Sequence, residues 1–191
     1  MQPLRRAGGA AVLVVAVVLA AAGVKAFVGE SYYIPSASML PGLHLHDRII
    51  VSRLAYDLHD PRRGDVVVFR SPPGVLPPDP ATGLRRLGVD VGLVDASQVL
   101  VKRVVGLPGD TVTAAGGRVY VDGRLLVEPY LAAGTVTADF GPVRVPPGHL
   151  FVMGDNRGDS EDSRIFGPVP TSSVVGRALW RVWPLDRFAP L

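Results

Sequence analysis

The feature that most constrains this chain is an uncharged apolar run near its N-terminus. Residues Ala7 to Val24 include no charged side chain, and Arg5 and Arg6 precede them. These 18 residues would rise about 27 Å as an α-helix, close to the roughly 30 Å hydrocarbon core of a bilayer. The ammonium group of Lys25 can reach the interface. We therefore expect a transmembrane anchor over residues 7–28.

The charges that flank this run predict its orientation. Basic residues on the N-terminal side favour a cytoplasmic N-terminus, residues 1–6, so that residues 31–191 form an extracytoplasmic domain on the cell membrane. The alternative is a cleavable secretion signal, because small residues at Ala20-Ala21-Ala22-Gly23 follow a basic start and an apolar core. We favour the anchor because the run is long and no clear Ala-x-Ala site ends it.

The rest of the chain reads as mainly β. It is rich in Val, Gly and Pro, which is typical of many short strands joined by turns. Six stretches are predicted as strands: 30–34, 48–51, 65–69, 99–105, 148–153 and 174–182. Short hairpins, with a tight turn at Asp122-Gly123, predict a small inserted β subdomain over about 111–147. The Pro- and Gly-rich segment 71–98 is predicted to be a surface excursion with little regular structure.

Composition and charge exclude several classes of chemistry. The chain has no cysteine, so disulfides, thiolate catalysis and cysteine-ligated zinc are excluded. The net charge is +3, but no long basic block is present, and we expect a mixed-charge surface without a nucleic-acid partner. His44-x-His46 offers only two ligands at a weak spacing, so we predict no metal and no cofactor.

The first polar segment with chemical potential is the stretch from Pro35 to Pro41. Ser36 and Ser38 stand two residues apart, and in an extended chain such residues face the same side. Two hydroxyls on one side can supply a nucleophile and an oxyanion donor. On its own, Ser-x-Ser beside proline is more often a plain turn.

The second segment is the strand that contains Lys102. Strand alternation puts Lys102 on the face of Leu100 and Val104, and Arg103 on the opposite face, so one of the two charges is expected to face the interior. Lysine can lose its proton, whereas arginine cannot. An apolar setting lowers the lysine pKa, and a base near neutral pH needs a fall of about two units or more, roughly 3 kcal/mol. The alternative is an edge strand with both charges solvated.

The third segment is the acid-rich stretch from Gly154 to Arg164. A calcium loop of the EF-hand type fails here, because position 3 counted from Asp155 is Arg157 and position 12 is Phe166. The remaining interpretation is a tight polar loop whose carboxylates can pair with Arg157 and Arg164.

In chain order, these segments resemble the sequence boxes of the serine–lysine type I signal peptidases. The likeness runs from about Tyr32 to Pro184, apart from the Pro-rich excursion. It rests on four stretches: Pro35-Ser36-Ala37-Ser38-Met39, Arg63-Gly64-Asp65, Lys102-Arg103-Val104-Val105-Gly106-Leu107-Pro108-Gly109-Asp110, and Gly154-Asp155-Asn156-Arg157 with Ser160 and Asp162-Ser163-Arg164. The resemblance implies a signal-peptidase-like β catalytic domain and a serine endopeptidase with a Ser-Lys dyad.

The resemblance also implies roles for four residues at the reaction centre. Ser38 would attack the scissile carbonyl, and neutral Lys102 would take its proton and later give one to the leaving amine. The Ser38 backbone N–H and the Ser36 hydroxyl would form the oxyanion hole. Ser160 would hydrogen-bond Lys102 and orient it.

Supporting residues follow from the same resemblance. Asp162 and Arg164 would form an ion pair, and Asp155 would help to hold the loop. The chain departs from the family pattern at Gly42, where threonine is frequent, and at Gly158, where aspartate is frequent. Neither position touches the expected proton path, although both can alter loop rigidity.

The implied substrates are secretory preproteins, cut after small residues at positions −1 and −3 of their signal peptides. The physical counterpart is a shallow pair of pockets beside an extended-peptide groove, and the lipid bilayer is the second expected partner. One alternative is a self-cleaving serine–lysine peptidase of the SOS-repressor type, against which the membrane segment argues. Others are a catalytically inactive, membrane-tethered β domain that binds peptides, and a secreted structural β domain. Intact Ser38, Lys102 and Ser160 argue against the inactive domain. The secreted domain would require removal of the N-terminal segment and coincidental motifs.

Overall fold

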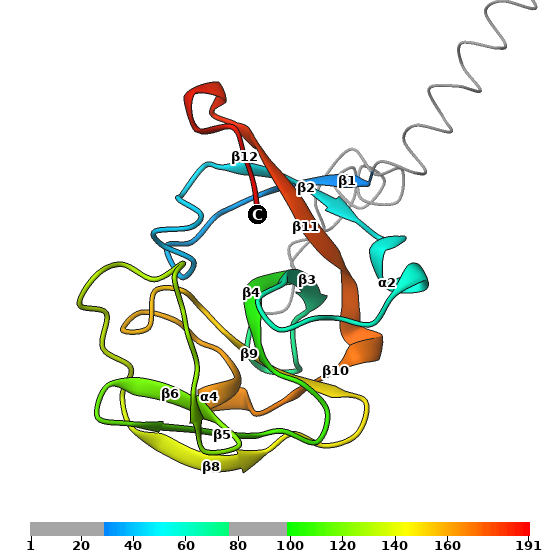
Figure 1. Ribbon diagram of the computed structural model, residues 1–191. Helices are drawn as coiled ribbons and strands as arrows, with labels where there is room; N and C mark the ends of the chain where they lie inside the picture. Colours follow the sequence, from blue (N-terminus) through cyan, green and yellow to red (C-terminus); the bar gives the residue numbers. More distant parts are fainter. Residues whose placement is uncertain (1–28, 77–98) are drawn as a thin grey trace, which may run out of the picture.

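The computed structural model describes residues 29–76 and 99–191. Within these ranges the chain is mainly β, as predicted, and its strands form an eight-stranded and a four-stranded antiparallel sheet (Figure 1). The expected anchor over residues 7–28 and most of the Pro-rich excursion lie outside the described residues. Of the helices in the described part, none has the length and apolar character needed to span a membrane.

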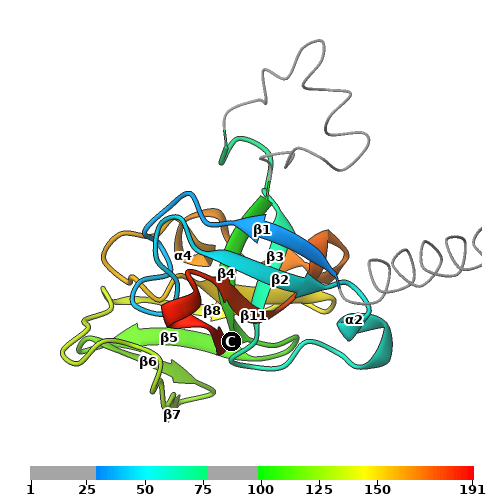
Figure 2. The ribbon, with the colours of Figure 1, turned by 90° about the horizontal axis from the view of Figure 1, so that it is seen from above.

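The larger sheet has the strand order β1-β2-β11-β3-β4-β9-β10, with β12 added to β11. Its strands are β1 (Glu30–Tyr33), β2 (Arg48–Ser52), β3 (Val66–Arg70), β4 (Val99–Gly106), β9 (His149–Met153), β10 (Val169–Pro170), β11 (Val174–Trp183) and β12 (Ala189–Pro190). Register shifts interrupt the pairing of β11 with both of its neighbours and that of β4 with β9. Such bulges bend a strand and increase its twist, and the sheet curls accordingly (Figure 2).

The smaller sheet has the order β7-β6-β5-β8. Its strands are β5 (Thr111–Ala115), β6 (Arg118–Val121), β7 (Arg124–Leu125) and β8 (Phe140–Arg144). Asp122 and Gly123 both have positive φ, 50° and 73°, as the predicted tight turn requires. Strand β8 was not predicted, because Gly141 and Pro142 argue against a strand; its edge position tolerates them.

The core joins the two sheets. Strand β3 is buried on both faces. Val66 and Val68 pack in one cluster, and Val67 and Phe69, on the opposite face, pack in another. A third cluster combines residues of both sheets: Val105, Phe151 and Met153 from the larger, and Val112, Ala114 and Val119 from the smaller. Each such side chain contributes about 1.5–3 kcal/mol by burial. The smaller sheet is therefore fixed against β4 and β9.

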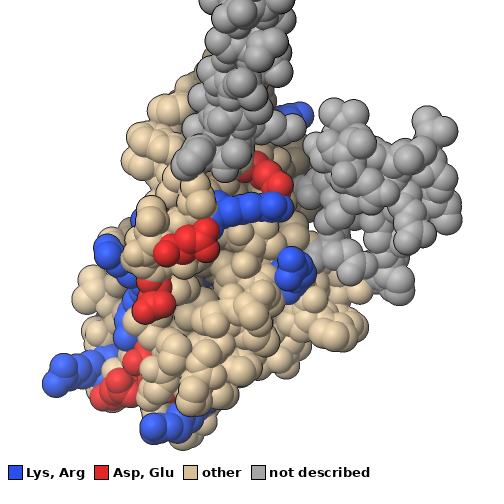
Figure 3. Space-filling model, turned by 90° about the vertical axis from the view of Figure 1, so that its right-hand side faces the viewer, with Lys and Arg blue, Asp and Glu red and all other residues tan. Residues whose placement is uncertain are grey.

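The remaining regular elements are short: α2 (Ala55–Leu58), α4 (Ser163–Phe166), η1 (Thr171–Ser173) and η2 (Leu185–Arg187). On the face of the molecule seen in Figure 3, basic and acidic side chains are interspersed rather than gathered by sign. This distribution agrees with the predicted mixed-charge surface.

Candidate active site

Ser38 lies in the loop that joins β1 to β2. Three apolar side chains of this loop are buried, Ile34 at 2%, Met39 at 1% and Leu43 at 0% exposure. The Leu43 N–H also donates to the Met39 carbonyl at 2.9 Å. Because these contacts fix the loop to the core, the half-buried Ser38 is held in place beside the sheet.

Lys102 reaches this loop from the middle of β4. The side chain is buried, with the residue 3% exposed, and its Nζ atom lies 2.7 Å from Ser38 Oγ. Its strand neighbours Leu100 and Val104 pack in the cluster of Val67 and Phe69, which is the face that alternation predicted. Two residues far apart in the sequence thus meet at hydrogen-bond distance.

Burial lowers the pKa of Lys102 from 10.5 to about 8. Asp162, Glu161 and Asp155 oppose this shift, and Arg164 reinforces it. With such a pKa, about a tenth of the amine is neutral at pH 7. A neutral amine at 2.7 Å from a hydroxyl can accept its proton.

Ser36 lies beside the same hydroxyl. Its Oγ atom is 3.2 Å from Ser38 Oγ, so the two serines do face one side, as their spacing predicted. Ser36 itself is exposed. It can therefore contact a bound peptide as well as Ser38.

Ser160 is packed tightly beside Gly154. A side chain at Gly154 would collide with both the Ser160 hydroxyl and the Ser38 carbonyl, so only glycine fits between them. The Ser160 Oγ atom is buried and has no hydrogen-bond partner among the described residues. The expected hydrogen bond between Ser160 and Lys102 is not formed here, since the Lys102 amine is directed at Ser38 and the Ser160 hydroxyl packs against Gly154.

Asp162 and Arg164 form the expected ion pair. Arg164 Nε and Nη2 donate to the two Asp162 oxygens at 2.8 and 2.7 Å, and the Gly154 N–H donates to Asp162 Oδ2 at 2.9 Å. Burial by itself would raise the pKa of Asp162, but these hydrogen bonds outweigh it and hold the pKa below its usual value. Asp162 also caps α4 by accepting from the Arg164 N–H. One carboxylate thus ties α4 to the end of β9.

Arg103 points to the face of β4 opposite Lys102, as alternation predicted. That face is also interior: the Arg103 side chain is 11% exposed, so the expectation that only one of the two charges is buried was wrong. Arg103 Nε and Nη2 bind both oxygens of Asp155 at 2.8 and 2.7 Å, and Nη1 donates to the Gly64 carbonyl at 2.8 Å. Asp155, 1% exposed, is thereby held as the resemblance implied, by a partner that the sequence did not reveal.

Arg157 has a different partner from the one expected. Its guanidinium pairs with Glu128, in the segment after β7, and not with a carboxylate of its own loop. Burial would lower the pKa of Arg157, but the hydrogen bonds with Glu128 outweigh this and raise it. Glu128 lies 29 residues before Arg157, and the acids of the loop itself are nearer candidates in the sequence.

The loop that follows β9 contacts the Ser38 segment directly. The Asn156 N–H donates to the Ser38 carbonyl at 3.0 Å, and Asn156 Nδ2 donates to the Ala37 carbonyl at 3.2 Å. Gly42 lies on the other side, where a β-carbon would come within 2.9 Å of Asp155 Oδ2. The position of Ser38 therefore depends on residues 154–157.

Two hollows of about 330 and 480 Å³ lie over the smaller sheet, and neither is lined by Ser38 or Lys102. The chemistry is therefore located by the side chains rather than by these cavities. A serine hydroxyl beside a buried amine of lowered pKa is an arrangement for nucleophilic acyl transfer. Asp162–Arg164 and Arg103–Asp155 hold the backbone around it.

Comparisons with known proteins give the family. The family described as "Signal peptidase, peptidase S26" matches residues 8–183. Signal peptidase I of Leptolyngbya laminosa is 40% identical over 174 residues, covering 91% of this chain and 78% of that protein. Probable signal peptidase I-2 of Synechocystis sp. is 41% identical over 175 residues, covering 92% and 72%.

Among solved structures, a signal peptidase I from Enterococcus faecalis is similar with a TM-score of 0.43 and 32% identity, covering 61% of this chain and 95% of that one. The family match spans nearly the whole chain, and the sequence identities extend over about nine-tenths of it. This chain therefore belongs to the signal peptidase family, peptidase S26.

Proposed function

We propose that this protein cleaves its substrates with Ser38 as nucleophile and Lys102 as general base. The protein is a serine endopeptidase that removes signal peptides from preproteins. The observation that carries the assignment of residues is the 2.7 Å contact between Ser38 Oγ and the buried Lys102 Nζ. Residues with this contact can perform both proton transfers that peptide cleavage requires.

In the proposed reaction, Ser38 Oγ attacks the scissile carbonyl as Lys102 takes its proton. The negative charge on the carbonyl oxygen is stabilised by the Ser38 N–H and the Ser36 hydroxyl. The Lys102 ammonium then protonates the leaving amine, and the signal peptide stays on Ser38 as an ester. Water, deprotonated by Lys102, hydrolyses the ester and restores Ser38.

Ser160 is proposed to orient Lys102 when the lysine carries the proton. A buried hydroxyl without a partner is costly, about 1–3 kcal/mol, so Ser160 gains from accepting a hydrogen bond. The Lys102 ammonium has three donors and needs acceptors once Ser38 has become an ester. Asp162 and Arg164 support this arrangement by fixing Gly154 and α4.

The substrate is proposed to reach the site at the membrane surface. Residues 7–28 would anchor the chain in the cell membrane, with residues 1–6 cytoplasmic and residues 31–191 extracytoplasmic. β1 begins at Glu30, and the eight residue-to-residue steps from there to Ser38 span at most about 30 Å. A secretory preprotein whose apolar segment is still in the bilayer would present its cleavage site within that reach, with small residues at −1 and −3.

The test uses the full-length protein in detergent with a preprotein that carries alanine at −1 and −3. We expect cleavage by the wild type, none by Ser38→Ala, and none when leucine replaces alanine at −1. Cleavage by Ser38→Ala would refute the assignment of the nucleophile. A catalytically inactive peptide-binding domain would instead bind the preprotein and leave it whole.

A further inference from the structure

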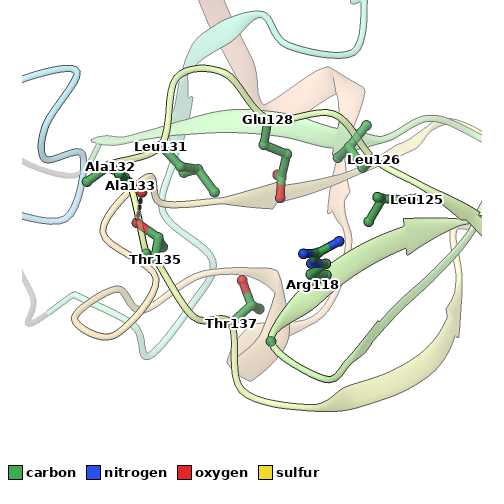
Figure 4. A pocket seen from close by; sticks show the side chains of 11 residues that line it. Arg118, Leu125, Leu126, Glu128, Leu131, Ala132, Ala133, Thr135 and Thr137 are labelled. Atoms are coloured by element: carbon green, nitrogen blue, oxygen red, sulfur yellow. Dashed lines mark hydrogen bonds between the residues drawn. The ribbon is translucent and has the colours of Figure 1, made fainter.

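A buried ion pair, Arg157–Glu128, connects the loop that contacts Ser38, residues 154–157, to the smaller-sheet region. Arg157 Nη1 and Nη2 both donate to the Glu128 carboxylate, and Nη1 also donates to Thr137 Oγ1 at 3.0 Å. The side chains of Arg157 and Glu128 are 1% and 9% exposed. Figure 4 shows Glu128 and Thr137 pointing toward one another across the hollow beside β6.

Glu128 has a second connection, through Tyr130. The Tyr130 hydroxyl donates to Glu128 Oε1 at 2.8 Å, and the Arg103 guanidinium stands over the Tyr130 ring, 4.0 Å from its centroid. A cation over an aromatic face is attracted to it. Since Arg103 also binds Asp155, Glu128 is linked to residues 154–157 at two points.

At the catalytic end, Arg157 Nε donates to the Gly154 carbonyl at 3.1 Å. Gly154 is the residue that lies against both the Ser38 carbonyl and Ser160. Two residues further on, the Asn156 N–H binds the Ser38 carbonyl at 3.0 Å. Glu128 is therefore connected to the backbone of Ser38 through Arg157 and residues 154–156.

We propose that Glu128, assisted by Thr137, is a positioning residue for catalysis: through Arg157 it fixes the backbone of residues 154–157 against Ser38. The inference rests on the proposed roles of Ser38 and Lys102. Arg157 cannot stay buried without its carboxylate, because an unpaired buried charge is strongly unfavourable. Loss of Glu128 would move Arg157 toward water, and the loop would move with it.

A displaced loop would also change the surroundings of Lys102. The charged groups that act on Lys102 are Asp155, Glu161, Asp162 and Arg164, all on the segment that begins at this loop. If water reaches Lys102, the burial that lowers its pKa weakens. The pKa then rises toward 10.5, and the acid limb of the pH–rate profile moves to higher pH. A substitution that only destabilises the fold would not move that limb.

The experiment compares variants of the full-length protein in detergent. Glu128→Ala removes both acceptor oxygens, and Glu128→Gln keeps the shape and one of them. Thr137→Val replaces the buried hydroxyl by a methyl group. Asp139→Asn is the matched control, because Asp139 is an exposed acid of the same region. Preprotein cleavage gives kcat, KM and the acid limb, and thermal unfolding shows that each variant is folded at the assay temperature.

We expect Glu128→Ala to lower kcat by about ten- to a hundredfold, as displacements of about 1 Å do, with KM changed less than about threefold. The kcat of Glu128→Gln and of Thr137→Val should fall between those of Glu128→Ala and the wild type. The acid limb should lie at higher pH in each of these variants, while Asp139→Asn keeps the wild-type kcat and acid limb. Should the Glu128 variants not fold, Thr137→Val decides. A folded Thr137→Val or Glu128→Ala with wild-type kcat and acid limb would overturn the proposal.

A fall in activity that follows the unfolded fraction, with an unmoved acid limb, would likewise overturn it and leave Glu128 a structural residue. These outcomes are separate from a failure of the proposed function. Cleavage by Ser38→Ala would remove the catalytic assignment itself, whereas wild-type activity of the Glu128 variants beside an inactive Ser38→Ala would remove only the positioning role.

Discussion

The two faces of β4 bury neighbouring cations in opposite ways. On one face Lys102 points at Ser38, and in the part of the chain that the structure describes it forms no ion pair. On the other face Arg103 is bound by both oxygens of Asp155, by the Gly64 carbonyl and by the ring of Tyr130. Lys102 is thus buried with a hydrogen bond to Ser38 and, within the described residues, no paired carboxylate. Arg103 is buried with a paired carboxylate, a carbonyl acceptor and an aromatic ring around its charge.

This difference shows how one strand can serve chemistry and structure together. Burial without a paired carboxylate lowers the pKa of Lys102 to about 8, so the amine can lose its proton. Arg103, bound by both oxygens of Asp155, is a fixed point for the loop at Asp155. We expect substitutions on the Lys102 face to remove activity, and substitutions on the Arg103 face to remove stability first.

The largest expected effect is the loss of turnover in Lys102→Met. Methionine has a similar volume but no basic nitrogen, so Ser38 loses its proton acceptor. We expect preprotein cleavage to fall by about a thousandfold or more, as it does when one member of a catalytic unit is removed. Near-normal cleavage by this variant would contradict the claim that the Lys102 face serves catalysis and the Arg103 face serves stability.

The next effect concerns stability on the opposite face. Asp155→Ala leaves Arg103 buried without its carboxylate, which should lower the free energy of unfolding by about 3–5 kcal/mol. Thermal and urea unfolding measure it. The control is the double variant Arg103→Met with Asp155→Leu, which removes both charges and should recover much of the loss. If the single and double variants are equally unstable, the pair does not stabilise the protein by neutralising the buried charge of Arg103.

A smaller effect, of opposite sign, is expected for the stability of Lys102→Met. The folded state holds Lys102 at a pKa near 8 and the unfolded state near 10.5, so below pH 8 the wild type carries a buried ammonium at a cost of up to about 3 kcal/mol. Between pH 8 and 10.5 the folded lysine is deprotonated while the unfolded one is not, and the wild type gains stability. The variant should therefore be more stable at pH 7, and its advantage should vanish above pH 10.5.

The smallest effect is expected at an exposed pair. Arg53 and Glu30 form an ion pair at 2.8 Å, but their side chains are 60% and 46% exposed. Water screens such a pair, so Arg53→Ala should change the free energy of unfolding by less than about 1 kcal/mol. A loss comparable to that of Asp155→Ala would show that burial does not set the value of ion pairs in this protein.

The sequence predicted one side of this comparison and not the other. Period-two alternation assigned Lys102 to the face of Leu100 and Val104, and the two-residue spacing put Ser36 beside Ser38. The sequence did not predict which residues pack against each face of β4, because alternation tells which way a side chain points and not which residues it meets. Asp155 pairs with Arg103 across 52 residues.

Other differences have the same origin. Strand β8 was missed because Gly141 and Pro142 carry a local signal for a turn, which pairing at a sheet edge overrides. Glu128 was missed because Arg157 stands among acids of its own loop, yet those acids are bound by Arg103 and Arg164 or face water. Motif order predicted which segments meet, whereas the ion pairs that hold them depend on the folded chain.

The most direct test of the account is the titration of Lys102 itself. The chain has two lysines, Lys25 and Lys102, so protein labelled with ¹³C at lysine Cε gives two signals by NMR, and Lys102→Arg identifies the one from Lys102. We predict that this signal titrates at about 8. If the Lys102 signal titrates near 10.5 instead, Lys102 is an ordinary solvated ammonium, and it cannot be the base for Ser38 near neutral pH.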